Sequence, residues 1–356
     1  MFFVQNINCH FHFPNKGYFM QKRIGFLLAL FMFMNCCAYA NFSLDCLELQ
    51  SEFLYFKPTL DQSHYVISST NNRFGGNVYP DGRRHMNHSR YSPGFRVGAS
   101  YSLCCENAID ARFTQLRSHH SNSVSGPFLF DTIGYPGDGA QFPEDTTYEG
   151  TARSHRHFRY YAGDLNLSRL TFSSFCPENL SFFIGLHYAH IRVKEHFDSV
   201  GTGIDGSTVT PVSNHLTRQT KFWGIGPQFG IDYHYDFTCL GDGLLSLTAN
   251  GRTALLCSNT HARFRYVTTR TGPVGVNIHN DSLWRVTPTV DARLGLSYKF
   301  CVCCTEVKVE GGYEFIWYHH CFDGITGLDV AYAGDTIDLY SNLNLHGPYL
   351  SLQIAF

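Results

Sequence analysis

The stretch GPYLSLQIAF at residues 347–356 alternates strictly between two kinds of side chain. One face of the extended chain carries Leu350, Leu352, Ile354 and Phe356, and the other face carries smaller or more polar residues. Successive side chains of a strand point to opposite faces of a sheet, so this period of two predicts a β-strand. A soluble sandwich and a transmembrane barrel both alternate in this way, so the pattern predicts a strand without identifying its surroundings.

The same alternation recurs along the chain in segments separated by clusters of Gly, Asn, Asp and Pro. Most segments run for about 10–14 residues, which suits a tilted strand that crosses a bilayer, whereas sandwich strands are typically about 5–6 residues long. Links of about 3–10 residues alternate with links of about 22–38 residues, as short periplasmic turns alternate with long extracellular loops in outer-membrane barrels. The ten predicted strands are 47–69 with a kink near Pro58, 92–103, 107–117, 156–169, 180–192, 220–234, 243–257, 285–298, 306–318 and 346–356.

Aromatic residues near the predicted strand ends also favour a membrane barrel, because such barrels carry aromatic girdles at both interfaces. We therefore predict an all-β fold, a transmembrane antiparallel β-barrel of about 10–12 strands, with an upper bound of about 16 if predicted loops such as 118–155 hide further hairpins. A secreted β-sandwich is the alternative. The girdle candidates are Trp223, Tyr233, Tyr298, Trp317, Tyr318 and Phe356.

The composition excludes several classes of protein. Of the 356 residues, 16% are charged and 44% hydrophobic, with a formal net charge of −2. This balance lacks the excess of positive charge that is typical of nucleic-acid-binding domains, and the apolar content is too high for a disordered chain. Outside the first 40 residues there is no apolar run of about 18 residues, so a bundle of membrane-spanning helices is not expected.

The N-terminal segment has the pattern of an export signal. A basic pair at 22–23 precedes an apolar run and then an Ala-Tyr-Ala sequence that ends at Ala40. We predict an N-terminal extension plus signal peptide over 1–40, cleaved after Ala40, and a barrel domain over 41–356. Met20 is an alternative start to the first methionine. Export and a barrel together predict the outer membrane of a Gram-negative-type envelope.

Charged and polar residues fall on the faces opposite the apolar ones. An Arg or Lys that faces lipid costs roughly 2–4 kcal/mol at mid-membrane, so these residues are expected to face the lumen. Both signs occur, so they either set up a field across a water-filled pore or form ion pairs that fill a narrow barrel. Gly224, Gly226 and Gly230 either open room in the lumen or permit a bend. The pore-lining candidates are Arg96, Asp110, Arg112, Asp164, Gln228, Asp232, Arg252, Asp291, Arg293, Lys308, Glu310 and Glu314.

Ten cysteines remain after the predicted cleavage, and eight of them fall in the predicted short turns or just before the first strand. Cys257 and Cys321 lie nearer the other rim. In an oxidising compartment such clustering favours disulfides, either between turns or with neighbouring proteins. A zinc site built on the Cys-x-Cys-Cys sequence is a third, less favoured reading, because no second ligand pair accompanies it. The disulfide candidates are Cys46, Cys104, Cys105, Cys176, Cys239, Cys301, Cys303 and Cys304.

The chain carries no recognisable catalytic motif. The sequences G-x-S-x-G, the P-loop and H-E-x-x-H are all absent. GTGIDG at 201–206 matches a dinucleotide-binding pattern in letters, but no helix pattern follows it. The 19 histidines lie mostly in predicted loops, and a candidate pair such as His196 with Asp198 cannot be placed from sequence. We therefore predict no enzymatic activity, no catalytic residues, no cofactor and no metal site.

Several segments resemble the pore-forming outer-membrane proteins of the chlamydial major outer membrane protein type. The resemblance implies a β-barrel porin that is sometimes disulfide cross-linked. The terminal Phe356 also resembles the signal that the outer-membrane assembly machinery reads. The resemblance is spread over the segments EFLYFKP (52–58), FWGIGPQFGIDYHYDF (222–237), GYEFIWY (312–318) and NLNLHGPYLSLQIAF (342–356).

Together these observations predict a porin that lets small hydrophilic solutes or ions diffuse passively through a water-filled barrel. The alternative is a disulfide-cross-linked structural or adhesive surface protein with little pore activity. The expected partners are outer-membrane lipid, the barrel-assembly machinery, and either other copies of the chain or periplasmic proteins joined by disulfides. Nucleic acid is not among them.

Overall fold

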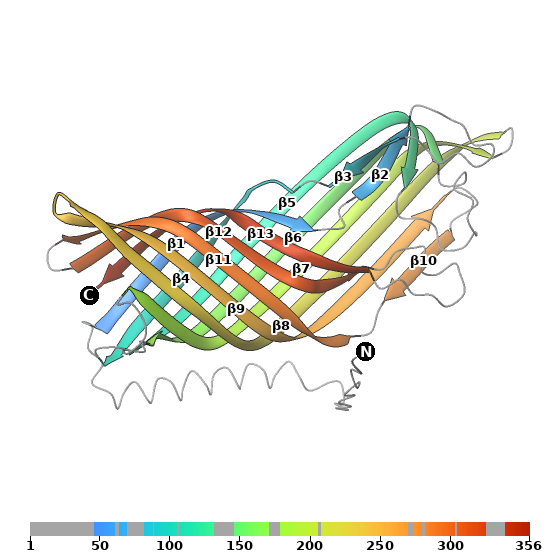
Figure 1. Ribbon diagram of the computed structural model, residues 1–356. Coiled ribbons are helices and arrows are strands. Elements are labelled where there is room, and N and C mark those ends of the chain that lie inside the picture. The colour runs from blue at the N-terminus through green and yellow to red at the C-terminus, as the bar shows by residue number, and fades with distance from the viewer. Residues whose placement is uncertain are drawn as a thin grey trace, which may run out of the picture. The chain divides into compact units, whose positions relative to one another are not determined.

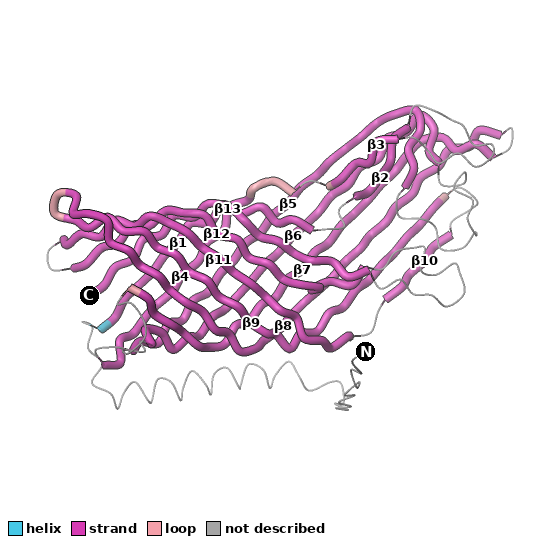
Figure 2. Tube along the Cα trace, in the orientation of Figure 1, coloured by secondary structure: helices cyan, strands magenta, loops and turns pink. Residues whose placement is uncertain are grey.

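The structure is a computed structural model in which nearly every described residue belongs to a β-strand (Figure 2). Residues 1–45, which contain the predicted signal peptide, lie outside the described part of the chain. Among the described residues, no helix is long and apolar enough to cross a membrane. The described residues are 46–60, 64–69, 82–87, 89–104, 107–131, 146–170, 179–205, 208–269, 274–279, 282–302, 305–324 and 339–356.

Within this part of the chain, ten strands pair antiparallel and close a barrel, in agreement with the predicted fold class. Three shorter strands pair outside the closed ring: β2 (His64–Ser69), β3 (Gly82–Met86) and β10 (Val274–His279). The ten barrel strands are β1 (Leu47–Leu60), β4 (Ser92–Cys104), β5 (Asn107–Asp131), β6 (Thr146–Leu170), β7 (Leu180–Asp205), β8 (Thr208–Leu240), β9 (Gly243–Thr268), β11 (Leu283–Val302), β12 (Thr305–Gly324) and β13 (Leu339–Ala355).

The first and last strands of the barrel lie side by side (Figure 1). The register pairs Glu48 with Ala355 and Leu60 with Leu343, and the backbone N–H of Phe356 donates to the carbonyl of Leu47 at 3.1 Å. The ring is therefore closed by main-chain hydrogen bonds between segments about 300 residues apart. A closed ring leaves no exposed sheet edge in the membrane.

At the end of the barrel where Leu47 and Ala355 lie, strands are joined by short turns, as predicted. Only two residues separate β4 from β5, β8 from β9, and β11 from β12. In an outer-membrane barrel the short turns and both chain ends lie on the periplasmic side. The outward faces above these turns are apolar and exposed, as contact with lipid requires, and include Phe95, Leu165, Ile184, Phe229, Leu255, Leu294 and Leu350.

Five neighbouring strands, β5 to β9, continue well beyond this apolar belt. They have 25, 25, 26, 33 and 26 residues, whereas β1 and β4 have 14 and 13. About 9–11 residues suffice to cross a bilayer, so the remainder projects from the outer side (Figure 1). We call this projecting part the extension. β2, paired with β3, adds to the β5 edge of the sheet, and β10 adds to the β9 edge.

The extension corrects two sequence predictions. Strands were predicted to end at 117 and 192 and to begin at 156 and 220, with long loops between them, but β5 and β6 pair from Ala108 to Phe130. The outward residues here are Ser, His and Arg rather than apolar residues, because this part of the sheet meets water. The alternation is present, but its apolar face turns inward. The predicted strand 47–69 also splits into β1 and β2.

The lumen-facing glycines on β8 make room for neighbouring parts of the wall. A Cβ atom on Gly230 would lie 2.1 Å from the ring of Phe183, and one on Gly226 would lie 1.9 Å from the carbonyl oxygen of Leu255. Gly230 thus admits an inward phenylalanine from β7, and Gly226 lets β8 approach β9 closely. The space left by these glycines is filled by the barrel itself.

Candidate functional site

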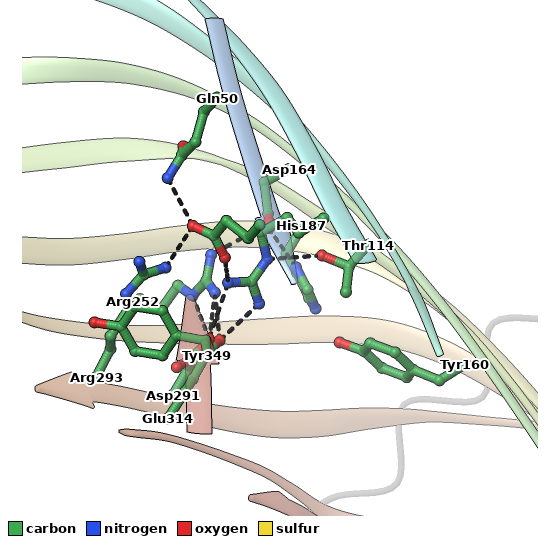
Figure 3. Close-up of polar contacts among 12 residues, drawn as sticks. Gln50, Thr114, Tyr160, Asp164, His187, Arg252, Asp291, Arg293, Glu314 and Tyr349 are labelled. Atoms are coloured by element: carbon green, nitrogen blue, oxygen red, sulfur yellow. Dashed lines mark hydrogen bonds and ion pairs between the residues drawn. The ribbon is translucent and has the colours of Figure 1, made fainter. Parts of the chain in front are cut away.

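The lumen at mid-barrel is crossed by a polar network that we define by three arginines, Arg96, Arg252 and Arg293, and the carboxylates they bind. Arg96, on β4, is 2% exposed. Its Nη1 donates to Glu52 at 2.8 Å, its Nη2 donates to Glu314 at 2.7 Å, and its Nε donates to the hydroxyl of Thr114 at 2.9 Å. One guanidinium thereby joins β1, β4, β5 and β12 across the barrel. Figure 3 labels two of its partners, Thr114 and Glu314.

The other two arginines extend the network from β9 and β11. Arg252 donates to Asp291 at 2.6 Å, to Asp164 at 3.2 Å and to Glu314 at 3.4 Å. Every one of these carboxylates is nearly enclosed, so the charges are compensated by one another rather than by water.

Arg293 binds two carboxylates and an aromatic ring. It donates to Glu52 at 2.7 Å and to Glu310 at 2.9 Å, and its guanidinium lies 3.6 Å from the ring centre of Tyr349. The Tyr349 hydroxyl donates to Glu310 at 2.7 Å. Glu52 is shared between Arg96 and Arg293, and Glu314 between Arg96 and Arg252, so the network is continuous from wall to wall.

A hydrogen-bonded chain leads from this network toward the outer side. Asp164 and His187 Nδ1 lie 2.6 Å apart, His187 Nε2 lies 3.0 Å from the hydroxyl of Tyr318, and that hydroxyl lies 2.9 Å from the hydroxyl of Tyr160. The two tyrosines are buried, and their hydroxyls meet inside the barrel. The cavity beside them holds only about 10 Å³, the limit for a single water molecule.

An apolar layer, which we call the lumen seal, fills the barrel directly outside the network. The ring of Tyr318 packs against those of Tyr160 and Phe222 at centroid distances of 6.1 and 6.2 Å, and Phe222 packs against Phe322 at 6.5 Å. The other large members are buried side chains from seven strands: Leu54, Phe56, Leu60, Leu116, Phe158, Ile191, Leu256, Ile316, Leu343 and Leu345. At this level the described side chains from opposite walls of the barrel are buried in one contiguous apolar cluster.

On the periplasmic side of the network, the lumen widens into a polar vestibule. Its cavity holds about 460 Å³. Charged residues of both signs line it, among them Glu48, Asp110, Arg112, Asp232 and Lys308. Water and small solutes can therefore enter from the periplasmic end as far as the network.

The structure places all twelve predicted pore-lining residues on the inward faces of the barrel strands. Asp110, Arg112, Asp232 and Lys308 line the vestibule. Arg96, Asp164, Arg252, Asp291, Arg293, Glu310 and Glu314 belong to the network, and Gln228 donates to Asn166 beside it. Of the two arrangements left open by the sequence, ion pairs that fill the interior describe the network. Asp291 pairs with Arg252 rather than with Arg293, its neighbour on the strand.

Several residues of the site were not predicted from the sequence. Glu52, Tyr160, His187 and Tyr349 lie inside the barrel, and Tyr318, assigned to an aromatic girdle, is fully buried in the lumen seal. Glu52 could have been found, because it lies on the same strand face as Glu48 and Gln50. Tyr318 could also have been placed, since it shares a face with Glu310 and Glu314. The other inward aromatic residues are uncharged, so the sequence did not indicate that they point into the lumen.

A second buried ion cluster lies in the extension. Arg156 donates to Glu195 at 2.6 Å, Arg218 donates to the same carboxylate at 2.9 Å, and Arg156 also donates to the carbonyl of Asn87 at 3.0 Å. Burial alone would raise the pKa of the Glu195 carboxyl, but the two guanidiniums outweigh it and lower the pKa to about 2. An apolar cluster beyond it, including Phe197, Leu216 and Phe264, gives the extension its own core.

The described histidines lie in strands rather than in loops, many of them in the extension. His196 and Asp198 do not form a pair: His196 lies 3.1 Å from the hydroxyl of Thr217, and Asp198 binds His215. Both contacts are on the outward face of the sheet. Among the described residues, no group of three or more His, Cys, Asp or Glu side chains is arranged to hold a metal ion.

The cysteines form no disulfide within the described residues. Cys46, Cys239 and Cys301 lie at the periplasmic end as predicted, and Cys257 is exposed on the outward face of β9. Cys321 is buried in the lumen seal, where its thiol lies 3.7 Å from the carbonyl of Ser341. Cys104 ends β4, and its side chain lies outside the described part of the structure, as do Cys105, Cys176, Cys303 and Cys304. The predicted cross-links stay a prediction.

Acidification is expected to loosen the extension. Burial lowers the pKa of His120, His157 and His196, and nearby cations, including Arg156 and Lys194, lower it further. A histidine whose pKa is lower folded than unfolded favours the folded state above about pH 6.5, and this advantage is lost as the pH falls. The Glu195 carboxyl, with its pKa lowered to about 2, keeps its contribution until the pH falls below about 4.5.

The measurement is amide hydrogen exchange of residues 150–160 and 190–200 in lipid without phosphate groups, corrected for intrinsic rates. Protection should fall between pH 7.5 and 5.5 in the extension and stay constant in β1 and β13. The double variant His157→Gln, His196→Gln should show a smaller change. Equal protection of the extension at both pH values would contradict the prediction.

A family model matches this chain over residues 45–356, and its description is the Legionella pneumophila major outer membrane protein precursor. The match spans all the strands of the barrel. It supports an outer-membrane protein in general terms and does not test the resemblance to the chlamydial proteins. The search of curated proteins returned no match.

Solved structures give much weaker similarities. The outer membrane protease OmpT of Escherichia coli shares 11% identity at a TM-score of 0.40, covering 89% of this chain and 99% of that one. The toluene transporter TodX of Pseudomonas putida shares 7% at 0.32, with 87% and 89% covered. The translocator domain of the autotransporter NalP from Neisseria meningitidis shares 9% at 0.28, with 95% and 98% covered. Similarities at this level carry no argument about the activity of this chain.

Proposed function

The chain belongs to the Legionella pneumophila major outer membrane protein family, and from this premise we propose that it is a surface barrel of the outer membrane whose lumen is shut to solutes. This is the structural or adhesive alternative that the sequence left open. The observation that carries it is the lumen seal. Phe56, Phe158, Phe222 and Tyr318 are each at most 1% exposed, and they fill the cross-section outside the polar network.

A hydrated ion cannot cross this level without losing its water. The seal offers two tyrosine hydroxyls, and these already bond to each other and to His187. Hydrophobic constrictions block conduction because water itself leaves them. The network below adds a second barrier, because its carboxylates and guanidiniums already satisfy one another.

The extension supports a role outside the cell. It is a sheet of five long strands, with short strands paired at both edges, and it has its own apolar core and its own buried ion cluster, so it is a rigid platform rather than a set of loops. Rigid platforms position the loops that contact other molecules. We assign it no enzymatic activity. The partners we propose remain outer-membrane lipid, the barrel-assembly machinery, and other copies of the chain or periplasmic proteins.

Passive diffusion of small hydrophilic solutes or ions is the second candidate. The polar vestibule of about 460 Å³ favours it, because a lumen that served only to hold the barrel together would not need a solute-sized opening. Glu52 and Glu314 each bind two arginines, so ion pairs could exchange partners without leaving a charge bare. The chlamydial resemblance implies the same function. Conduction would still require movement of the lumen seal.

Single-channel recording of refolded residues 41–356 in a planar bilayer separates the two candidates. We expect no discrete current steps from protein whose folding is verified by its heat-dependent mobility on a gel. A conducting porin inserted in the same bilayer is the control for detection. Discrete steps from the folded chain would overturn the proposal and establish the second candidate.

The cysteines at the periplasmic end support a cross-linked structural role. Cys239 and Cys301 are exposed, and Cys46 is partly exposed, so their thiols are accessible to a second protein. Electrophoresis of outer membranes with and without reductant tests this part of the proposal. Higher-mass species that disappear on reduction would support it, and identical patterns would remove the cross-linking from it.

A further inference from the structure

The outward face of the extension carries a row of basic side chains in direct register. Arg117 on β5 pairs with Arg159 on β6, Arg159 pairs with Arg192 on β7, and Arg192 pairs with Lys221 on β8. Lys221 pairs in turn with His261 on β9. We call these five residues the basic row. Like charges directly opposite on neighbouring strands destabilise a sheet, so such a row needs a source of negative charge.

The protein supplies very little of that charge. On the outward faces of β5 to β9, from the basic row to the level of Asp198, Asp198 is the only described carboxylate, and it binds His215. Arg117 donates to the hydroxyl of Tyr161 at 3.0 Å, and Arg192 donates to the side-chain oxygen of Gln219 at 3.1 Å. Both partners are neutral. The charge of the row is therefore left to be compensated from outside the protein.

The next two rows outward add three cations, Lys194, Arg263 and Arg265, which lie among histidines. The first contains His119, His157, Lys194 and Arg263, and the second contains His155, His196 and Arg265. The basic surface thus extends outward from the basic row over two further rows, on β7 and β9.

The position of the row relative to the lipid follows from the residues next to it. Two residues closer to the membrane along each strand, the outward residues are Tyr161, His190 and Trp223, which match an interfacial girdle. Another two residues in the same direction, Tyr188 and Ile225 are exposed and largely apolar. Outward residues two apart along a strand are separated by about 6.6 Å, so the row lies just beyond the girdle, among the lipid headgroups.

The opposite wall of the barrel differs at this level. β1, β12 and β13 carry the aromatic residues Tyr55, Tyr313 and His346, with Lys57 as their one outward cation among the described residues. The basic surface is therefore a property of one side of the barrel, as a binding site would be, and not of its whole circumference.

We propose that the basic row binds the phosphate groups of the phosphorylated glycolipid that forms the outer leaflet, lipopolysaccharide. Arg presents a planar fork of donors that matches phosphate oxygens, and charge-assisted hydrogen bonds of this kind are among the stronger ones. A headgroup with more than one phosphate engages several strands of the row at once. Its negative charge compensates the repulsion between the facing cations.

The test compares the triple variant Arg159→Gln, Arg192→Gln, Lys221→Gln with the intact chain, both folded in phosphatidylcholine nanodiscs. The control variant removes three outward cations elsewhere: Lys57→Gln, Arg83→Gln, Arg90→Gln. Purified lipid A in the nanodisc is the probe, and its dissociation constant is the readout. Each basic side chain near an anionic lipid surface contributes about a factor of five, so the triple variant should bind lipid A about a hundredfold more weakly. The control variant should bind within about threefold of the intact chain.

Three further probes identify the source of the phosphate. The intact chain should bind dephosphorylated lipid A about as weakly as the triple variant binds lipid A. Phosphatidylglycerol should bind more weakly than lipid A, and inorganic phosphate should not compete at millimolar concentration. Equal binding of phosphorylated and dephosphorylated lipid, unchanged binding by the triple variant, or competition by free phosphate would each overturn the proposal. If the triple variant fails to fold, the single variant Arg192→Gln should bind lipid A about fivefold more weakly than the intact chain. Unchanged binding of lipid A by this single variant would also overturn the proposal.

Discussion

Replacing Arg96 by methionine is expected to lower the free energy of unfolding of the barrel by about 3–5 kcal/mol, the cost of leaving buried charges without their partner. The Arg96 side chain is 2% exposed and is bound by Glu52 and Glu314, which are both enclosed in the lumen. Methionine has a similar length but no charge, so the two carboxylates would lose their shared guanidinium. Urea unfolding in lipid vesicles, followed by tryptophan fluorescence, measures the loss.

Arg112→Met is the matched control for this variant. Arg112 also points inward, from the neighbouring strand β5, but it lines the vestibule and is partly exposed there. Its replacement should cost no more than about 1 kcal/mol, because a charge that water reaches contributes little to stability. Adding Glu314→Gln to Arg96→Met should cost less than the sum of the two single changes, because it removes a charge that the first change left unpaired. A loss for Arg96→Met no larger than for Arg112→Met would mean that water reaches the network freely.

Truncating Phe222 to alanine tests the lumen seal and should cost about 3–5 kcal/mol, as for buried phenylalanines in other cores. Phe222 is 0% exposed and packs against Tyr318 and Phe322. A well-packed interior cannot collapse into the space left behind, so the loss of transfer energy is increased by a cavity.

Phe229→Ala provides the comparison on the same strand. Phe229 is 47% exposed on the lipid-facing side of β8, so its truncation leaves no enclosed cavity and should cost only the transfer contribution, about 1.5–3 kcal/mol. Unfolding of both variants is measured under identical conditions. A cost for Phe222→Ala equal to or below that for Phe229→Ala would contradict a packed seal, and would favour a hydrated lumen and the pore function.

The strand set could be predicted from sequence because the membrane imposes a simple rule on both faces. Leu350 and Leu352 meet lipid while Ser351 faces inward, and a charge on the wrong face costs too much to persist. For the same reason the inward placement of Arg96, Asp164 and Glu314 could be predicted.

The extension and the lumen seal could not be predicted because neither follows that rule. In the extension the outward residues are polar, so His119 and His155 looked like loop composition although their strands, β5 and β6, are regular. In the seal, apolar residues such as Leu54 and Phe56 lie inward, on a strand whose outward Phe53 and Tyr55 are also apolar. A strand that is apolar on both faces gives no signal of which face is the core. Only the neighbouring Glu52 indicates which face of β1 points into the lumen.

The pairing of β1 with β13 determines when the barrel can be completed during biogenesis. The strand that emerges first from export has its final neighbour in the last seventeen residues of the fold, so it must wait with one edge unsatisfied until the rest of the chain has arrived. During that interval two open edges are available to other chains, which makes the unfinished barrel prone to aggregation and dependent on an escort. The hydrogen bond from Phe356 to Leu47 belongs to the final step that removes both edges at once.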